Sequence, residues 1–265
     1  MNVNSGRIGR KKCLVAAMII GIVAGQFHAQ AARGNWDSGL DFVSFHYSEP
    51  SARMSEDGSM VGVVGTYARD FEDVAIRSEA SFDWGIIGYD GFLMNFKTGE
   101  TISAMKLDTP NCVLNLRLSG GPLLKIDASS LRITPLVGVG FRYLVNDLPG
   151  VGGYLRQQIY WYAPVGMEVA GDLSAGWSCV VRAEYDVFVD GENYSGGDSF
   201  TQKDGYGYQV SAGVSCLLPG KGARSVLVAP YMRYWNVSAS SVTEDGWLEP
   251  ANDCSEYGIR ASVAF

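Results

Sequence analysis

Apolar and polar side chains alternate along several stretches of this chain. In the clearest stretch, residues 74–88, Ile76 and Phe82 lie on one face, and Arg77 and Asp83 lie on the other. A repeat of two residues is typical of a β-strand, whereas a helix would scatter the charges around its circumference. The pattern therefore predicts a strand with one apolar face and one charged face.

The same alternation recurs often enough to predict about ten strands, with eight or twelve as the alternatives. The clear segments are 131–145, 177–187 and 206–217, the weaker ones are 40–48, 59–68, 112–120, 157–169 and 226–235, and the last is 256–265. The segments between them alternate between long and short. The long ones are 49–58, 89–111, 146–156, 188–205 and 236–255, and the short ones are 69–73, 121–130, 170–176 and 219–225. Outer-membrane barrels alternate long extracellular loops with short periplasmic turns in this way.

The last segment of the chain also points to a barrel. Apolar side chains stand at every second position, namely Tyr257, Ile259, Ala261, Val263 and Phe265. An exposed terminal strand of this kind would invite pairing with other chains, unless it closes a barrel in lipid. This ending resembles the C-terminal signature of bacterial outer-membrane β-barrel proteins. The resemblance implies that the barrel assembly machinery reads these five residues.

The amino terminus has the parts of a secretory signal peptide. Basic residues precede an uncharged run from residue 13 to residue 25, and Ala29 and Ala31 form a small-x-small cleavage site. We therefore expect cleavage near Ala31, a periplasmic lead segment over residues 32–39 and a barrel over residues 40–265.

The fold class follows from these patterns. We expect an all-β protein, an antiparallel up-and-down transmembrane β-barrel similar to the small porin-like barrels of Gram-negative bacteria. A secreted β-sandwich, which also alternates apolar and polar residues, is the other fold considered. Without residues 1–31 the chain has 17 basic and 28 acidic residues, a net charge of −11, so no basic footprint for nucleic acid is expected.

In a barrel, the polar faces of the strands point into the lumen. The expected lumen charges are Arg77, Glu79, Asp83, Arg117, Arg142, Arg182, Glu184, Asp186, Arg233 and Arg260. A barrel of about ten strands is narrow enough for long side chains to fill it. The favoured interpretation is a plug of paired charges. The alternative is a narrow path lined by arginine, which would favour small anions.

His46 is the one histidine that remains after residue 31, and with Ser48 it forms a His-x-Ser sequence near the expected outer rim. A hydrolase needs such a base, a nucleophile and an orienting partner. We expect a structural histidine instead, and no enzyme activity. The omptin proteases are barrels of similar size, and that resemblance would imply an Asp-His pair in an outer loop. Residues 188–205 contain acids but no histidine.

Four cysteines follow the expected signal peptide. Cys179 and Cys216 fall near the inner ends of consecutive strands, where a cross-strand disulfide and two separate lipid-facing thiols are both open. Cys112 and Cys254 fall at the outer rim and would join two loops that fold together. No Cys-x-x-Cys or histidine cluster occurs, so neither a metal site nor a cofactor is expected.

The sequence thus predicts location better than activity. The favoured function is a structural or surface-interaction role through the extracellular loops. The expected partners are membrane lipid, lipopolysaccharide, the assembly machinery and an extracellular ligand of undefined chemistry. A narrow anion channel and a hydrolase that uses His46 are the alternatives.

Overall fold

The structure is a computed structural model. It describes residues 35–94, 101–126, 129–150, 153–219, 225–244 and 246–264. The expected signal peptide and Phe265 lie outside the described residues. No helix within the described ranges is long and apolar enough to cross a membrane.

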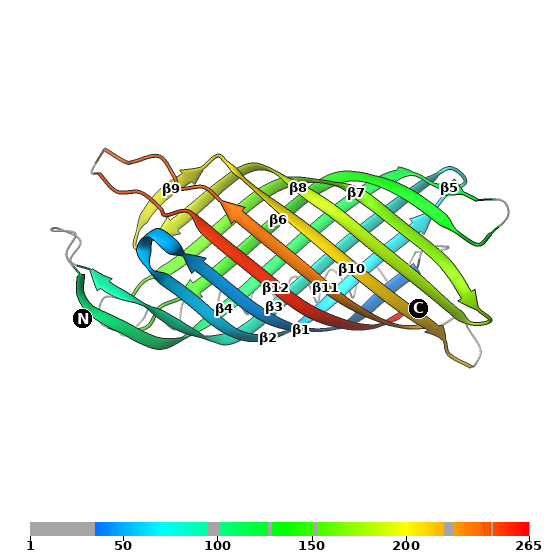
Figure 1. The fold of residues 1–265 in the computed structure, drawn as a ribbon, viewed down its shortest axis with the longest axis horizontal. Helices are drawn as coiled ribbons and strands as arrows, with labels where there is room; N and C mark the ends of the chain where they lie inside the picture. Colours follow the sequence, from blue (N-terminus) through cyan, green and yellow to red (C-terminus); the bar gives the residue numbers. More distant parts are fainter. Residues whose placement is uncertain are drawn as a thin grey trace.

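One antiparallel sheet makes up nearly all of the described chain, and it closes into a barrel (Figure 1). The ten barrel strands are β1 (Asn35–Glu49), β2 (Met54–Asp70), β3 (Val74–Met94), β4 (Thr101–Pro122), β6 (Arg132–Asp147), β7 (Leu155–Ser174), β8 (Trp177–Ser195), β10 (Gly205–Leu217), β11 (Ser225–Val237) and β12 (Asn252–Ala264). Two short strands, β5 (Leu124–Lys125) and β9 (Asp198–Gln202), pair with the ends of β6 and β8. A single 3₁₀ turn, η2 (Pro50–Ala52), joins β1 to β2.

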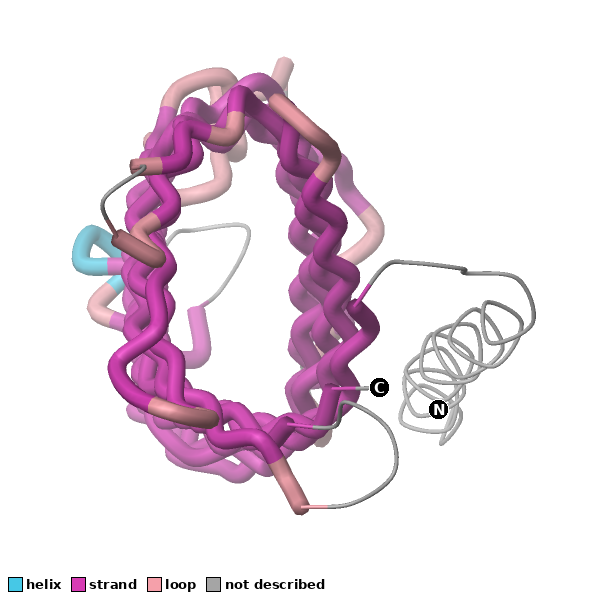
Figure 2. Tube along the Cα trace, turned by 90° about the vertical axis from the view of Figure 1, so that its right-hand side faces the viewer, coloured by secondary structure: helices cyan, strands magenta, loops and turns pink. Residues whose placement is uncertain are grey.

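The barrel closes because β12 pairs with β1 as well as with β11. Each other barrel strand pairs with its neighbours in sequence, so the topology is up-and-down, and the predicted fold class and strand number are confirmed. Seen along its length, the ring of strands is a closed oval (Figure 2). We call the end where β1 begins and β12 ends the inner end, and the opposite end the outer end.

The barrel is apolar outside and charged inside. Outward side chains such as Phe42 (54% exposed) and Trp84 (43% exposed) form a belt, while Arg142 and Glu256 on the inward face are almost fully buried. This distribution is the reverse of that in a soluble protein and fits a protein surrounded by lipid.

Aromatic side chains border the belt, as in outer-membrane barrels. On the outward face toward the outer end, the rings of Tyr185 and Tyr206 stack with centroids 6.0 Å apart, and Tyr206 contacts Tyr234 at 6.1 Å. At the inner end, Trp36 packs on Tyr67 at 4.6 Å. The two groups bound the apolar belt from both sides.

Several expected loops proved to be strand. Most of residues 49–58, 89–111 and 188–205 belongs to β2, β3, β4, β8 and β9, so the hairpins project well beyond the apolar belt. The prediction failed there because many outward residues of these extensions, such as Asp57, Lys106 and Asp108, are polar, so the strict alternation that marks a strand in lipid is lost. At the other end, β1 begins at Asn35, five residues before the expected start.

Candidate functional site

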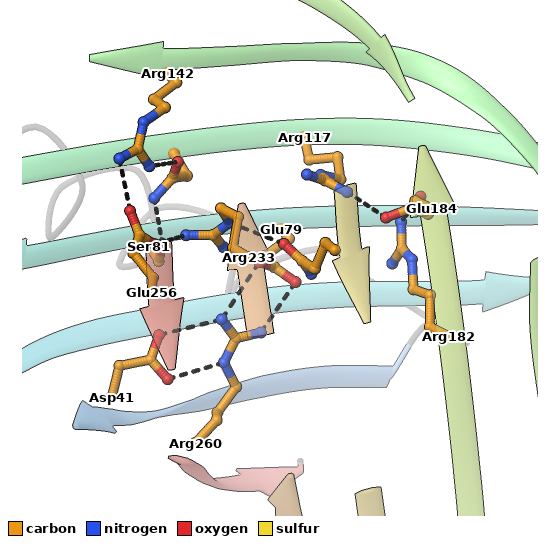
Figure 3. Close-up of polar contacts among 12 residues, drawn as sticks. Asp41, Glu79, Ser81, Arg117, Arg142, Arg182, Glu184, Arg233, Glu256 and Arg260 are labelled. Atoms are coloured by element: carbon orange, nitrogen blue, oxygen red, sulfur yellow. Dashed lines mark hydrogen bonds and ion pairs between the residues drawn. The ribbon is translucent and has the colours of Figure 1, made fainter. Parts of the chain in front are cut away.

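A chain of ion pairs crosses the middle of the lumen (Figure 3). Arg260 of β12 donates to both carboxylate oxygens of Asp41 on β1, each at 3.1 Å, and its Nη1 lies 2.9 Å from Glu79 on β3. Arg233 of β11 lies 3.6 Å from the same Glu79. Alternation on four strands therefore places these charges in one buried cluster.

Arg233 also links this cluster to the opposite wall. Its Nη1 lies 2.6 Å from Glu256, whose other oxygen lies 2.6 Å from Arg142. Arg142 belongs to β6 and Glu256 to β12, which stand five strands apart in the ring of ten. Side chains from opposite walls of the barrel therefore meet at its centre.

A second cluster fills the lumen beside β8. Arg117 of β4 pairs with Glu184 and, at 3.0 Å, with Asp186, and its guanidinium lies 5.3 Å from the centre of the Tyr162 ring. The space for that ring comes from Gly140, where an added Cβ would lie 2.1 Å from the Tyr162 ring carbons. The glycine at position 140 of β6 therefore makes room for the Tyr162 ring that lies against Arg117.

Arg156 of β7 is the centre of the outer cluster. It pairs with Glu49 of β1, again five strands away, and lies 3.3 Å from Glu56 of β2. Amide groups surround the carboxylates: Asn146 donates to Glu56 at 2.5 Å. The cluster lies at the outer end of the lumen and joins strands from opposite sides of the ring.

The third acid near Arg156 belongs to a loop. Glu249, in the segment 238–251 between β11 and β12, accepts a 2.5 Å hydrogen bond from Asn193 and lies 3.8 Å from Arg156. Burial, and the charge of Glu49 next to it, raise the pKa of Glu249 to about 7. The loop is thus fastened to the barrel mouth by a carboxyl group that titrates near neutral pH.

The inner end of the lumen is partly open. A cavity of about 410 Å³ is lined by polar residues that include Asp37, Thr66, Arg132 and Arg182. Arg77 reaches across this level from β3 to Glu168 on β7, at 2.8 Å. Arg260 and Glu79 also line the cavity, so the central cluster stands where the cavity ends.

The charge balance of the lumen differs from the predicted one. In the part of the chain that the structure describes, seven arginines pair with ten carboxylates. Asp83 is also buried, and neither of its oxygens has a hydrogen-bond partner there. Carboxylates therefore outnumber arginines in the lumen, whereas the anion-channel alternative expected a lining rich in arginine.

All ten predicted lumen charges lie on the inward face, yet sequence reasoning missed seven that complete the clusters. These are Asp41, Glu49, Glu56, Arg156, Glu168, Glu249 and Glu256. Asp41 and Glu256 lie at alternating positions of expected strands, so the pattern contained a signal for them. Glu49, Glu56 and Glu249 fell in expected loops, where no pattern marks an inward side chain.

His46 stands outside the lumen. It lies on the outward face of β1, where its Nδ1 is hydrogen-bonded to Asp57 of β2. The two side chains are 48% and 63% exposed. The His-x-Ser sequence thus lies at the outer rim as predicted, with a carboxylate that the sequence did not assign to it.

Comparisons with known proteins concern the fold. No family model and no curated protein matches the chain. The outer-membrane protease OmpT from Escherichia coli has a similar structure, with a TM-score of 0.62 over 89% of this chain and 99% of that one, at 10% identity. Ail of Yersinia pestis has a TM-score of 0.30 at 10% sequence identity, covering 88% of this chain and 100% of Ail. TodX of Pseudomonas putida has a TM-score of 0.35 at 11% sequence identity, covering 89% of this chain and 90% of TodX. This chain has the fold of a bacterial outer-membrane β-barrel.

The likeness of this outer-membrane β-barrel to OmpT concerns the fold alone at 10% identity. The acids of the extension at residues 188–205 have no histidine among them in the sequence. Within the described ranges, no three histidine, cysteine or acidic side chains are placed to hold a metal ion.

Of the two arrangements left open for Cys179 and Cys216, the structure has the separate thiols, and the pairing of Cys112 with Cys254 was wrong, because Cys254 is a free thiol. Cys179 and Cys216 are free thiols, because Cys179 faces Val214 across the β8–β10 ladder and Cys216 faces Trp177. Diagonal neighbours in a sheet are about 7–8 Å apart, beyond the reach of a disulfide. Cys254 is also free, and it lies in the lumen 3.3 Å from Arg142.

In the C-terminal strand of the barrel, the alternating apolar side chains face outward, as predicted. Tyr257 and Ile259 are exposed on the outward side of β12, and Ala261 also faces outward. Whether the assembly machinery reads this strand, with Val263 and Phe265, stays a prediction.

Proposed function

We propose that this outer-membrane β-barrel is closed to solutes and acts through its outer surface, as a structural or surface-interaction protein. The observation that carries the proposal is the contact between opposite walls. Arg142 with Glu256, and Arg156 with Glu49, join strands five apart in the ring of ten. A permeating ion would have to break these buried pairs.

The outer loops support a role at the surface. The segment 238–251 is shaped by hydrogen bonds from Ser240 to Glu249 and from Thr243 to Trp247, and it exposes the apolar side chains of Val242 and Leu248. An ordered loop with exposed apolar residues has a low entropic cost of binding. Lipopolysaccharide and an extracellular protein are the partners we propose for this end of the barrel.

Single-channel recording of the refolded protein in a planar bilayer tests the proposal. We expect no steady conductance steps from protein that shows the heat-modifiable gel mobility of a folded barrel. Reproducible steps that change in size on Arg142→Ala or Arg233→Ala would contradict the proposal and would assign the lumen to transport.

A further inference from the structure

His46 has an acid on one side and a hydroxyl on the other. Directly across the ladders, it faces Asp57 of β2 and Ser255 of β12. Residues directly opposite each other in a sheet point to the same face, with Cβ atoms about 4.5–5.5 Å apart. The three side chains therefore form a row on the outside of the barrel, in the order acid, imidazole, hydroxyl.

The hydrogen bond to Asp57 orients the imidazole. When Nδ1 donates its proton to the carboxylate, Nε2 is left with a lone pair and can act as a base. The two nitrogens lie on different edges of the ring. With Nδ1 bonded to Asp57 on β2, the Nε2 edge is left free on the side of β12, the strand that carries Ser255 directly opposite His46.

Ser255 is available for this contact. In the described part of the chain, its hydroxyl makes no hydrogen bond to another residue, and the side chain is partly exposed. Carboxylate, imidazole and hydroxyl in this order are the groups that activate a serine nucleophile. We propose that Asp57, His46 and Ser255 form a hydrolase site for carboxylic esters on the outward face of the barrel.

The surroundings indicate a lipid ester as the substrate. The apolar belt lies below the row: Tyr257 is two residues from Ser255 on β12, and beyond Ser44 and Ser59 come Phe42 on β1 and Val61 on β2, all three apolar side chains more than half exposed. The polar Asp253 and Ser48 lie on the outer side of the row. An acyl chain that lies along the belt would bring its ester group to the level of Ser255.

The reaction is an acyl transfer that needs no oxidant or metal. Ser255 Oγ attacks the ester carbonyl as its proton moves to His46 Nε2. The bond to the alkoxy oxygen then breaks, and the proton from Nε2 goes to that oxygen to release an alcohol. Water next attacks the acyl-serine, gives a proton to Nε2, and releases a fatty acid as Ser255 regains its proton.

This inference concerns the outward face, so it is independent of the closed lumen. It also departs from the expectation of a structural histidine and no enzyme activity. The sequence contained His46 and Ser48 but could not show which residues the neighbouring strands bring beside the imidazole.

The test uses protein refolded from inclusion bodies, which excludes hydrolases of the host membrane. A fluorogenic phospholipid in mixed micelles reports hydrolysis, and a fluorophosphonate probe followed by peptide mass spectrometry locates a reactive serine. We expect the probe on Ser255 and a loss of activity of about 100-fold or more in Ser255→Ala and His46→Ala. Heat-modifiable mobility shows that each variant is folded.

Asp57 acts through His46 as a positioning residue, so its variant needs a separate readout. We expect Asp57→Asn to lower kcat with KM unchanged, and Asp57→Glu to restore part of the rate.

Ser59→Ala is the matched control, because Ser59 lies on the same outward face of β2 and should keep wild-type activity. A probe on Ser44 or Ser48, or a rate that does not fall in His46→Ala, would overturn the proposal. A folded wild-type protein without hydrolysis or labelling would also overturn it.

Discussion

Arg260 shows how a single residue stabilises the charged lumen. Its guanidinium contacts Asp41 and Glu79, which come from two other strands, and all three side chains are buried. A buried ion pair adds little net stability compared with apolar packing, but the loss of one partner leaves the other charge buried and uncompensated. The importance of Arg260 is therefore set by the two acids that it neutralises.

We predict that Arg260→Met lowers the free energy of unfolding by about 3–5 kcal/mol. The double variant Arg260→Met, Glu79→Gln should be less destabilised than the sum of the two single variants, because it removes an unpaired charge. Urea unfolding of the refolded barrel in lipid vesicles, followed by tryptophan fluorescence, measures both effects. Additive losses would show that the two residues are not coupled.

The same residues show what sequence can predict about the site. Arg260 and Glu79 lie at alternating positions of apolar strands, so their inward direction is readable from the chain. The sequence alone does not predict that the two side chains pair, because the pairing depends on which strands face each other across the ring. Asp57 and Ser255 were missed as neighbours of His46 for a related reason, because the register between strands determines which residues lie beside the imidazole.

The strands are longer than the membrane requires. About 9–11 residues span a bilayer, whereas β3 has 21 residues and β4 has 22. The extra length forms walls beyond the apolar belt at the outer end, and the loop 238–251 is fastened to β7 and β8 through Glu249. Segments outside lipid lose strict alternation, so the sequence located the strands but misjudged their ends.

The fastening of this loop should depend on pH. The pKa of Glu249 is raised to about 7, above the value of an unfolded glutamate, so the closed loop binds its proton more tightly than an open one. The charges that face it are Glu49, Glu56 and Arg156. Its contribution to loop closure is full at acidic pH and declines as the pH rises toward and past 7.

We predict slower hydrogen exchange in residues 238–251 at pH 5.5 than at pH 8, after correction for intrinsic exchange rates. Glu249→Gln keeps the shape but cannot ionise, so it should remove most of the difference. Stronger protection at pH 8 in the wild-type protein would show that the charged carboxylate holds the loop.

The ring of strands is oval in cross-section (Figure 2), and arginine and glutamate side chains from strands five apart in the ring meet inside it. Strand number and up-and-down order were predictable from alternation and turn length. The shape of the cross-section was not, because it depends on the volumes of side chains from all ten strands. The acidic surplus of the lumen was missed in the same way.

If the barrel is closed as proposed, replacing the two central arginines with alanine should make it conduct ions with a definite preference for one charge. In Arg142→Ala, Arg233→Ala we expect a space beside Glu256 and a larger excess of negative charge, and therefore conductance that favours cations. Reversal potentials in a KCl gradient measure the preference. Selectivity for chloride in the folded variant would contradict the charge balance described for the lumen.

The position of Glu256 and Arg260 on β12 has a consequence for biogenesis. Of the barrel strands, β12 is the last in chain order, and it carries both residues that complete the central ion pairs. Before β12 docks, Asp41, Arg142 and Arg233 line an open trough that water can fill. The pairing of β12 with β1 and the loss of water from the lumen therefore occur in the same step. A chain truncated before β12 should remain a hydrated, protease-sensitive intermediate.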